Sequence, residues 1–357
     1  MTRKFKNICR LAAALLFCTV AVRGQEIAGN PYREEVVFFE NSKAGIRLAG
    51  TLTLPDAVGR FPAVVLVSGS GAQNRDEELM GHKPFRVIAD HLTRAGIAVL
   101  RYDDRGTAAS EGDFSKATTA DLATDAEAAL RYLGTRKELD ASMIGLAGHS
   151  EGGAIAPLVA AQHPGDVAFI ILLAAPGVRG DSLLLLQSAA IQRAYRVDEQ
   201  RAQRALNINR SIYKLVSGDA APDALRSALE REITSDMTGG IPPDAFIDAQ
   251  IKQLSTPWLK YFLSYDPAPA LEKVSCPVLV LNGEKDLQVP AEINPGAIRE
   301  ALARGGNKRV RVRIFPRLNH LFQECLTGVP AEYPTLERTF VPEVLNEIVS
   351  WIKALPK

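Results

Sequence analysis

The stretch that most constrains this chain is Gly148-His149-Ser150-Glu151-Gly152, which lies between an apolar run at 144–147 and an alanine-rich helical pattern at 154–162. A strand, a tight turn and a helix in direct succession place Ser150 at the apex of the turn. Flanking glycines let the strand and the helix pass closely, and the helix N-terminus points backbone N–H groups at any developing negative charge. The pattern predicts a nucleophile elbow. A Gly-Ser turn that merely joins a strand to a helix is the alternative.

Composition limits the classes of partner. The chain has 357 residues, with 42 lysines and arginines against 41 aspartates and glutamates, so it offers no charge footprint for nucleic acid or an acidic membrane surface. Its 46% hydrophobic and 23% charged residues are typical of a globular protein. We therefore expect a small-molecule partner, while the oligomeric state stays open.

The first residues predict export. Basic residues at 3–10 precede an apolar run at 11–22 and the small residue Gly24. This pattern is typical of a signal peptide over 1–24, and the apolar run is too short to span a bilayer. A lipoprotein signal ending at Cys18 is the alternative, although bulky Phe17 before it argues against that. We expect release into the periplasm or the medium.

Two cysteines, Cys276 and Cys325, remain after such a cleavage. An oxidising compartment favours disulfides. However, Cys276 should begin a strand, whereas Cys325 should lie beyond the opposite strand ends, about five residues of roughly 3.3 Å away. We therefore predict two free, largely buried thiols.

The order of apolar and periodic segments predicts the fold class. Expected strands cover 61–67, 97–102, 143–147, 167–173, 277–281 and 310–315, and helices cover 83–95, 118–136 and 341–355. Apolar strands alternating with helices predict an α/β domain over 25–357, with a mostly parallel sheet covered on both faces. Two β-patterned segments within 33–60, joined by a turn cluster, predict an N-terminal hairpin.

A purely helical block at 178–265 interrupts this alternation. It contains helical patterns at 183–195 and 222–233 and a last stretch in which Pro257 predicts a new helix start. Ligands of open α/β sheets bind beyond the strand ends, so we expect an inserted cap over the site. A purely structural insertion is the alternative.

A serine nucleophile needs a base and a group that orients the base. Of the five histidines, His320 lies in a loop after the last expected strand, on the same side of the sheet as Ser150, and is the expected base. The loop after the preceding strand holds Glu284 and Asp286, and we select Asp286 because the turn lets it reach over the strand end. Its alternative role is to cap that turn.

The oxyanion hole of such a site needs two backbone N–H donors. One is expected from Glu151, directly after the nucleophile. The other is expected from the loop Ser68-Gly69-Ser70-Gly71, with Ser70 as the donor. The Glu151 side chain is expected to pair with Arg75 or Arg105.

The motifs that carry a family resemblance are Ser68-Gly69-Ser70-Gly71, Asn74-Arg75-Asp76, Arg101-Tyr102-Asp103-Asp104-Arg105-Gly106, Glu111-Gly112-Asp113-Phe114, Gly148-His149-Ser150-Glu151-Gly152-Gly153 and Asn319-His320. In this order they resemble the α/β-hydrolase superfamily, and within it exported bacterial hydrolases similar to EstD-type carboxylesterases and serine-aminopeptidase-like hydrolases. The resemblance covers nearly all of the chain after Tyr32. It implies an α/β-hydrolase fold with a helical cap, and the order Ser, Asp, His fits it.

One feature departs from that family. Similar proteins usually carry a second glycine shortly after Arg105-Gly106, whereas Thr107-Ala108-Ala109-Ser110 has none, so the backbone shape of this loop is in question. No histidine or cysteine set has metal-ligand spacing, and Gly69-x-Gly71 lacks the third glycine of a dinucleotide loop, so no metal or cofactor is expected.

The sequence therefore predicts a serine hydrolase that cleaves esters of small to medium acyl groups through Ser150, His320 and Asp286. Apolar cap residues such as Leu183, Trp258 and Phe262 favour an acyl substrate, although they could equally be the core of the cap. A serine exopeptidase that uses Glu151 to hold a peptide terminus is one alternative. A catalytically silent binding protein on the same fold is another.

Overall fold

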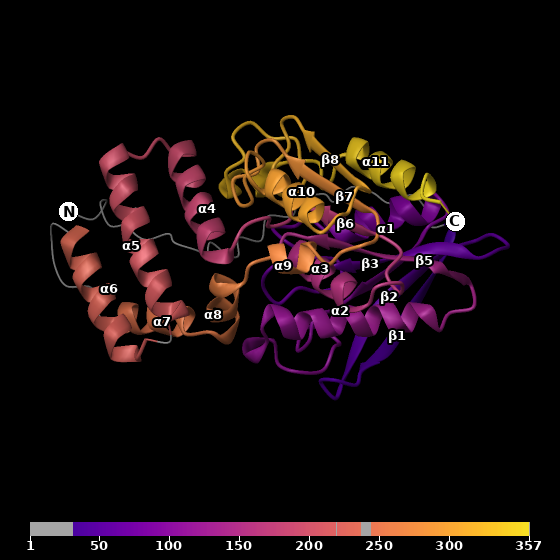
Figure 1. The fold of residues 1–357 in the computed structure, drawn as a ribbon, viewed down its shortest axis with the longest axis horizontal. Coiled ribbons are helices and arrows are strands. Elements are labelled where there is room, and N and C mark those ends of the chain that lie inside the picture. The colour runs from indigo at the N-terminus through magenta and orange to yellow at the C-terminus, as the bar shows by residue number, and fades with distance from the viewer. Residues whose placement is uncertain (1–30, 219, 237–243, 357) are drawn as a thin grey trace.

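The computed structural model describes residues 31–218, 220–236 and 244–356 (Figure 1). The predicted signal peptide at 1–24 lies outside these ranges. No helix among the described residues is long and apolar enough to cross a membrane.

An eight-stranded sheet forms the centre of the described structure. Its strands are β1 (Tyr32–Asn41), β2 (Ile46–Pro55), β3 (Phe61–Val67), β4 (Ala98–Tyr102), β5 (Leu139–His149), β6 (Ile170–Leu173), β7 (Val278–Gly283) and β8 (Val310–Phe315). They lie side by side in the order β1-β2-β4-β3-β5-β6-β7-β8. The β1–β2 hairpin is antiparallel and β2 is antiparallel to β4, whereas the other neighbours are parallel. The carboxyl ends of β3, β5, β7 and β8 therefore meet at one edge, where ligands bind in such sheets.

Helices cover both faces of this sheet, as Figure 1 shows. Helices α2 (Thr119–Gly134), α3 (Gly152–Gln162), α9 (Ala268–Leu271) and α10 (Asn294–Arg304) pack on one face, and α1 (Pro84–Arg94) and α11 (Pro342–Lys353) on the other. The 3-10 turns are η1 (Phe114–Lys116) and η2 (Pro330–Thr335). Strands β3 and β6, which lie between these layers, are apolar throughout because both of their faces are covered. The predicted α/β fold class is confirmed.

A separate block of helices extends from the carboxyl edge of the sheet, on the left of Figure 1. It comprises α4 (Gly180–Ala194), α5 (Glu199–Ser217), α6 (Pro222–Asp236), α7 (Asp244–Leu254) and α8 (Pro257–Ser264). The block has its own apolar cluster, built around Ile212, Tyr213, Leu229, Ile247 and Leu263. Helix α8 begins at Pro257, as predicted, and the Thr256 hydroxyl caps it by accepting the Leu259 N–H at 3.3 Å. We call this block the cap.

The two cysteines have no disulfide, as predicted. Cys325 is buried, but Cys276 is only half-buried, so the prediction of burial is fully correct for Cys325 alone. Burial raises the pKa of each thiol to about 11. Both are therefore poor nucleophiles at neutral pH.

The loop that lacks the family's second glycine still adopts a glycine-like conformation. The exposed residue Ala108 has φ +47°, in a turn closed by a 2.9 Å bond from the Ser110 N–H to the Thr107 carbonyl. A residue with a Cβ is strained in this left-handed region by about 1–2 kcal/mol. The loop therefore carries local strain at Ala108.

Replacing Ala108 with glycine is expected to raise the free energy of unfolding by about 0.5–1 kcal/mol, because the relief of strain exceeds the entropy that a glycine loses on folding. Urea denaturation followed by circular dichroism measures this change. Ala109→Gly is the matched control, since exposed Ala109 is not in the left-handed region and should lose about 0.5–1 kcal/mol. Equal changes in the two variants would contradict the strain at Ala108.

Candidate active site

Ser150 lies at the sharp turn between β5 and α3. Its φ of +52° is in the left-handed region, a conformation that costs free energy and is common where a side chain is held for function. Gly148 and Gly152 make this turn possible. A Cβ at Gly148 would lie 2.0 Å from the Gly152 carbonyl oxygen, and one at Gly152 would lie 2.1 Å from that of Val67. The strand–turn–helix geometry expected around Ser150 is therefore present.

The structure pairs His320 with Asp286. The His320 Nδ1 lies 2.8 Å from the Asp286 Oδ2, and both side chains are nearly inaccessible, at 4% and 2% exposure. The residues come from the loops after β8 and β7, which end side by side at the carboxyl edge.

Local hydrogen bonds fix the Asp286 carboxylate. Its Oδ1 accepts the N–H groups of Gln288 at 2.9 Å and Val289 at 2.8 Å, while Asn282 donates to Oδ2 at 3.3 Å. Asp286 therefore both caps this turn, which was its alternative role, and pairs with His320. Glu284 instead accepts the backbone N–H of Arg317 at 3.0 Å.

The 68–71 loop lies against the elbow. A side chain at Gly69 would come within 3.1 Å of the Ser150 Cβ. The Gly69 N–H is already donated to Glu77 Oε1 at 2.7 Å. In the part of the chain that the structure describes, the amides of Ser70 and Glu151 donate to no carbonyl or side chain, so both are available to a ligand at the turn.

The Glu151 side chain turns away from both arginines that were expected to hold it. Arg75 binds Asp103 through two nitrogens, at 3.1 and 2.6 Å, and Arg105 binds Asp125 at 2.7 and 2.9 Å. The expected pairing with Arg75 or Arg105 is therefore wrong. Each guanidinium already has a buried carboxylate that matches its fork.

Glu151 instead links the elbow to the cap. Its carboxylate accepts the Thr119 hydroxyl at 2.6 Å and the Trp258 indole N–H at 2.8 and 2.9 Å. The carboxylate is 1% exposed, and its burial raises its pKa, an effect opposed by bonds from Thr119, Trp258 and Ser70. Trp258, on α8, also stacks on Phe262 with ring centroids 5.2 Å apart. One side chain of the cap is thus fixed beside the residue that follows Ser150.

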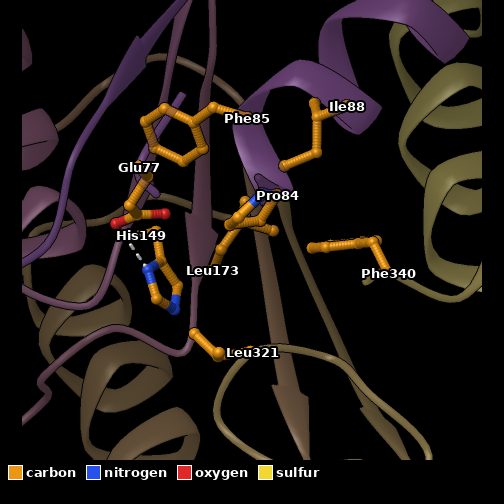
Figure 2. Close-up of a pocket in the computed structure, with 8 residues that line it drawn as sticks. All are labelled: Glu77, Pro84, Phe85, Ile88, His149, Leu173, Leu321 and Phe340. Carbon is orange, nitrogen blue, oxygen red and sulfur yellow. Dashed lines mark hydrogen bonds and ion pairs between the residues drawn. The ribbon is translucent and has the colours of Figure 1, made fainter. Parts of the chain in front are cut away.

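Glu77 and His149, drawn in Figure 2, form a second histidine–carboxylate pair. His149 Nδ1 is 2.8 Å from Glu77 Oε1, and His149 Nε2 is 3.0 Å from the backbone carbonyl oxygen of His320. The rings of His149 and His320 have centroids 4.8 Å apart. The side chain of His149 thus points away from the apex of the elbow and contacts the loop of His320.

No group of three or more histidine, cysteine, aspartate or glutamate side chains among the described residues could hold a metal ion. Of the other histidines, buried His82 contacts the Thr339 hydroxyl and the Tyr333 carbonyl, and half-buried His163 lies 3.0 Å from Glu127.

Comparisons with known proteins agree with this architecture. A family model described as serine aminopeptidase, S33, matches residues 83–219. Esterase EstD of Thermotoga maritima is 30% identical over 318 residues, which are 85% of this chain and 65% of EstD, so the chain spans slightly less than two thirds of that relative. The α/β hydrolase GrgF from Penicillium sp. sh18 has a TM-score of 0.56 at 18% identity, covering 90% of this chain and 98% of GrgF. The Pyrococcus furiosus esterase PF2001 has a TM-score of 0.55 at 13% identity, covering 94% of this chain and 98% of PF2001.

The chain has the α/β-hydrolase fold. The resemblance inferred from the motifs is therefore confirmed at the level of the fold.

Sequence reasoning missed three residues around Ser150. Glu77 and Thr119 have no motif that would identify them, and Trp258 was interpreted only as an apolar cap residue. All three contact the elbow through bonds that span long stretches of chain, 72 residues for Glu77 and 107 for Trp258.

Proposed function

We propose that this α/β-hydrolase is a serine carboxylesterase, with Ser150 as nucleophile, His320 as general base and acid, and Asp286 as the group that orients His320. The observation that carries the proposal is the 2.8 Å contact between His320 Nδ1 and Asp286 Oδ2, buried at the edge where Ser150 occupies its strained turn. EstD, the relative with 30% identity, is named an esterase.

The chemistry of each residue follows from its position. His320 takes the Ser150 proton through Nε2 as the hydroxyl oxygen attacks the acyl carbonyl, because Nδ1 already faces Asp286. The amides of Ser70 and Glu151 bind the oxygen of the tetrahedral intermediate, and each such donor is worth about 3–4 kcal/mol. His320 then returns the proton to the leaving alcohol. Water hydrolyses the acyl-enzyme by the same steps.

The surroundings of Glu151 favour an ester over a peptide substrate. An aminopeptidase would need an accessible carboxylate to bind the charged peptide N-terminus. Glu151 was the candidate for that role, but it is buried and already accepts bonds from Thr119 and Trp258. The aminopeptidase name of the matching family model keeps peptide cleavage as the second candidate.

Apolar packing next to Asp286 supports an acyl substrate. Leu183 of α4 and Phe262 of α8 pack against Val289, which follows Asp286 by three residues. Leu183 and Phe262 are each 4% exposed, so they form the junction between cap and core rather than an open pocket wall. We propose that this junction bounds the acyl side of the site and that the substrates are esters of small to medium acyl groups. We further propose export to the periplasm or medium, on the basis of the N-terminal pattern alone.

The test is hydrolysis of p-nitrophenyl esters from acetate to laurate beside a panel of aminoacyl p-nitroanilides. Ester turnover that declines beyond short and medium chains, with little anilide turnover, is the expected result. Anilide turnover that equals ester turnover would replace the esterase by the peptidase. If a fluorophosphonate does not label the protein and neither panel is hydrolysed, the result would favour the non-catalytic binding protein over both enzymes.

The bond between Trp258 and Glu151 is expected to stabilise the cap on the core. Replacing Trp258 with phenylalanine keeps an aromatic ring beside Phe262 but leaves a buried carboxylate short of a donor, which costs about 1–3 kcal/mol of the free energy of unfolding. A double-mutant cycle with Glu151→Leu, measured by urea denaturation, isolates this term. A coupling energy of about 1 kcal/mol or more is expected. Additive effects of the two changes would show that the bond contributes nothing.

A further inference from the structure

The mechanism does not use the buried ionisable pair formed by Glu77 and His149. Glu77 is 3% exposed and His149 is 6% exposed. Apart from Glu77 and His149, the small cavity between them and α1 is lined by apolar residues, namely Pro84, Phe85, Ile88, Leu173, Leu321 and Phe340 (Figure 2). Ionisable groups in apolar surroundings are expensive, and an apolar pair of similar volume would often stabilise a fold more. The pair therefore requires an explanation beyond stability.

The hydrogen bonds determine where the protons are. His149 Nε2 faces the His320 carbonyl oxygen at 3.0 Å, and a carbonyl can only accept, so Nε2 carries a hydrogen. His149 Nδ1 faces Glu77 Oε1 at 2.8 Å, and that oxygen also accepts the Gly69 N–H at 2.7 Å. When Glu77 is ionised its oxygens can only accept, so His149 Nδ1 must donate to Oε1 and His149 carries hydrogens on both ring nitrogens.

The pair joins three segments of the site. Glu77 Oε1 fixes the 68–71 loop through Gly69, His149 directly precedes Ser150, and His149 Nε2 holds the backbone of His320. Glu77 itself has φ +50°, so the chain accepts backbone strain to place this carboxylate. The pair therefore holds the 68–71 loop and the His320 loop by hydrogen bonds and adjoins Ser150 through the chain.

We propose that Glu77 and His149 are positioning residues, with Glu77 holding His149 as an imidazolium whose two N–H groups fix the 68–71 loop and the His320 loop around Ser150. This role rests on the proposed esterase function. The protonation state does not, because it is inferred from the contacts of His149 with an ionised Glu77 and with the His320 carbonyl.

Buried His82 provides an internal contrast. Its Nε2 also faces a carbonyl, that of Tyr333, but its Nδ1 faces the Thr339 hydroxyl, which can donate to a neutral ring. Burial lowers the pKa of His82, an effect that the Tyr333 carbonyl opposes. Burial also acts to lower the pKa of His149, but Glu77, the His320 carbonyl and Asp286 outweigh it and raise the pKa. Glu77, Asp286 and the ring of His320 are the ionisable groups that face His149 among the described residues.

The raised pKa also sets the sign of a pH effect. A histidine whose pKa is higher in the folded than in the unfolded chain stabilises the fold fully below its ordinary pKa of 6.5. This stabilisation is lost as the pH rises through the folded value, because a neutral His149 has one hydrogen for two acceptors. The loops around Ser150 should therefore loosen on the alkaline side.

The experiment is nitrogen NMR of the full chain labelled with ¹⁵N-histidine at pH 7. The signals are assigned by replacing the other four histidines one at a time. We expect His149 to carry hydrogens on both ring nitrogens and His82 on one only. A His149 with a single ring hydrogen at pH 7 would overturn the proposal whether or not Glu77→Gln folds.

Enzyme kinetics then test the positioning. In Glu77→Gln the side chain carries no negative charge to hold His149 as an imidazolium, so the Nδ1 contact that fixes the ring is lost when His149 becomes neutral. The kcat for p-nitrophenyl acetate is therefore expected to fall roughly 10- to 100-fold with little change in KM. His149 should then carry one ring hydrogen at pH 7. Glu78→Gln is the matched control, since Glu78 is exposed and its partners are Asn74 and Lys83, and it should leave kcat unchanged.

The outcomes separate the two proposals. A Glu77→Gln variant that is less stable but keeps its kcat would overturn the positioning role and leave the esterase intact. A wild-type chain with a doubly protonated His149 and no ester turnover would refute the esterase function and with it the positioning role, while the protonation state would stand.

Discussion

Replacing Ser150 with alanine is expected to reduce kcat for p-nitrophenyl acetate by about 10⁶-fold, because no other group at the elbow can form the acyl-enzyme. The amides of Ser70 and Glu151 would still bind the oxyanion, so a trace of hydrolysis above the rate in water should remain. Alanine at the same strained turn changes one oxygen atom, and the fold should survive. Steady-state kinetics and the mass of the protein after treatment with a fluorophosphonate measure the effect.

Ser142→Ala is the control for this change. Ser142 lies on the same strand, β5, but is exposed and donates only to the neighbouring Asp140. It should keep full turnover and full labelling. A Ser150→Ala variant that is still labelled, or that still hydrolyses esters at a substantial rate, would show that Ser150 is not the nucleophile.

The fold was accessible from the sequence because its signals are local. Strand β3 begins and ends where the apolar run 61–67 predicts, since a strand buried on both faces has no polar residue to interrupt it. The elbow could be predicted for the same reason. A Cβ at Gly148 would lie 2.0 Å from the Gly152 backbone, so the glycines that allow the turn must lie next to Ser150 in the sequence. The limits of β6 were less accurate. Val167 continues the apolar pattern, but pairing starts only at Ile170.

The partners of side chains were less accessible, because charge alone does not select among them. Arg75 and Arg105 were reasonable partners for Glu151 on charge. However, Asp103 and Asp125 offer each guanidinium two oxygens in a geometry that the sequence does not reveal. Trp258 illustrates the same limit, since its apolar ring predicts burial but not the direction of its single N–H.

The Glu77–His149 pair shows the limit most clearly. The sequence indicated only that the His149 side chain points away from the apex of the elbow. Glu77 belongs to no motif that would have identified it. Their contact depends on how the loop after β3 folds back under β5, and the backbone at Glu77 is in the left-handed region, which glutamate rarely adopts. Strained functional positions break the local rules on which sequence reasoning depends.

Replacing Asp286 with asparagine is expected to lower kcat about 10⁴-fold, because the amide would hold His320 in the wrong tautomer. The Asp286 Oδ1 accepts two backbone N–H groups, from Gln288 and Val289, so the asparagine must keep its carbonyl oxygen there and turn its NH₂ to His320 Nδ1. His320 would then carry its hydrogen on Nε2, where the Ser150 proton has to go. Glu284→Gln is the matched control and should change kcat less than about threefold, since its amide oxygen can still accept from Arg317. Kinetics on p-nitrophenyl acetate, with thermal unfolding to confirm the fold, compare the two, and a larger loss for Glu284→Gln would move the orienting role away from Asp286.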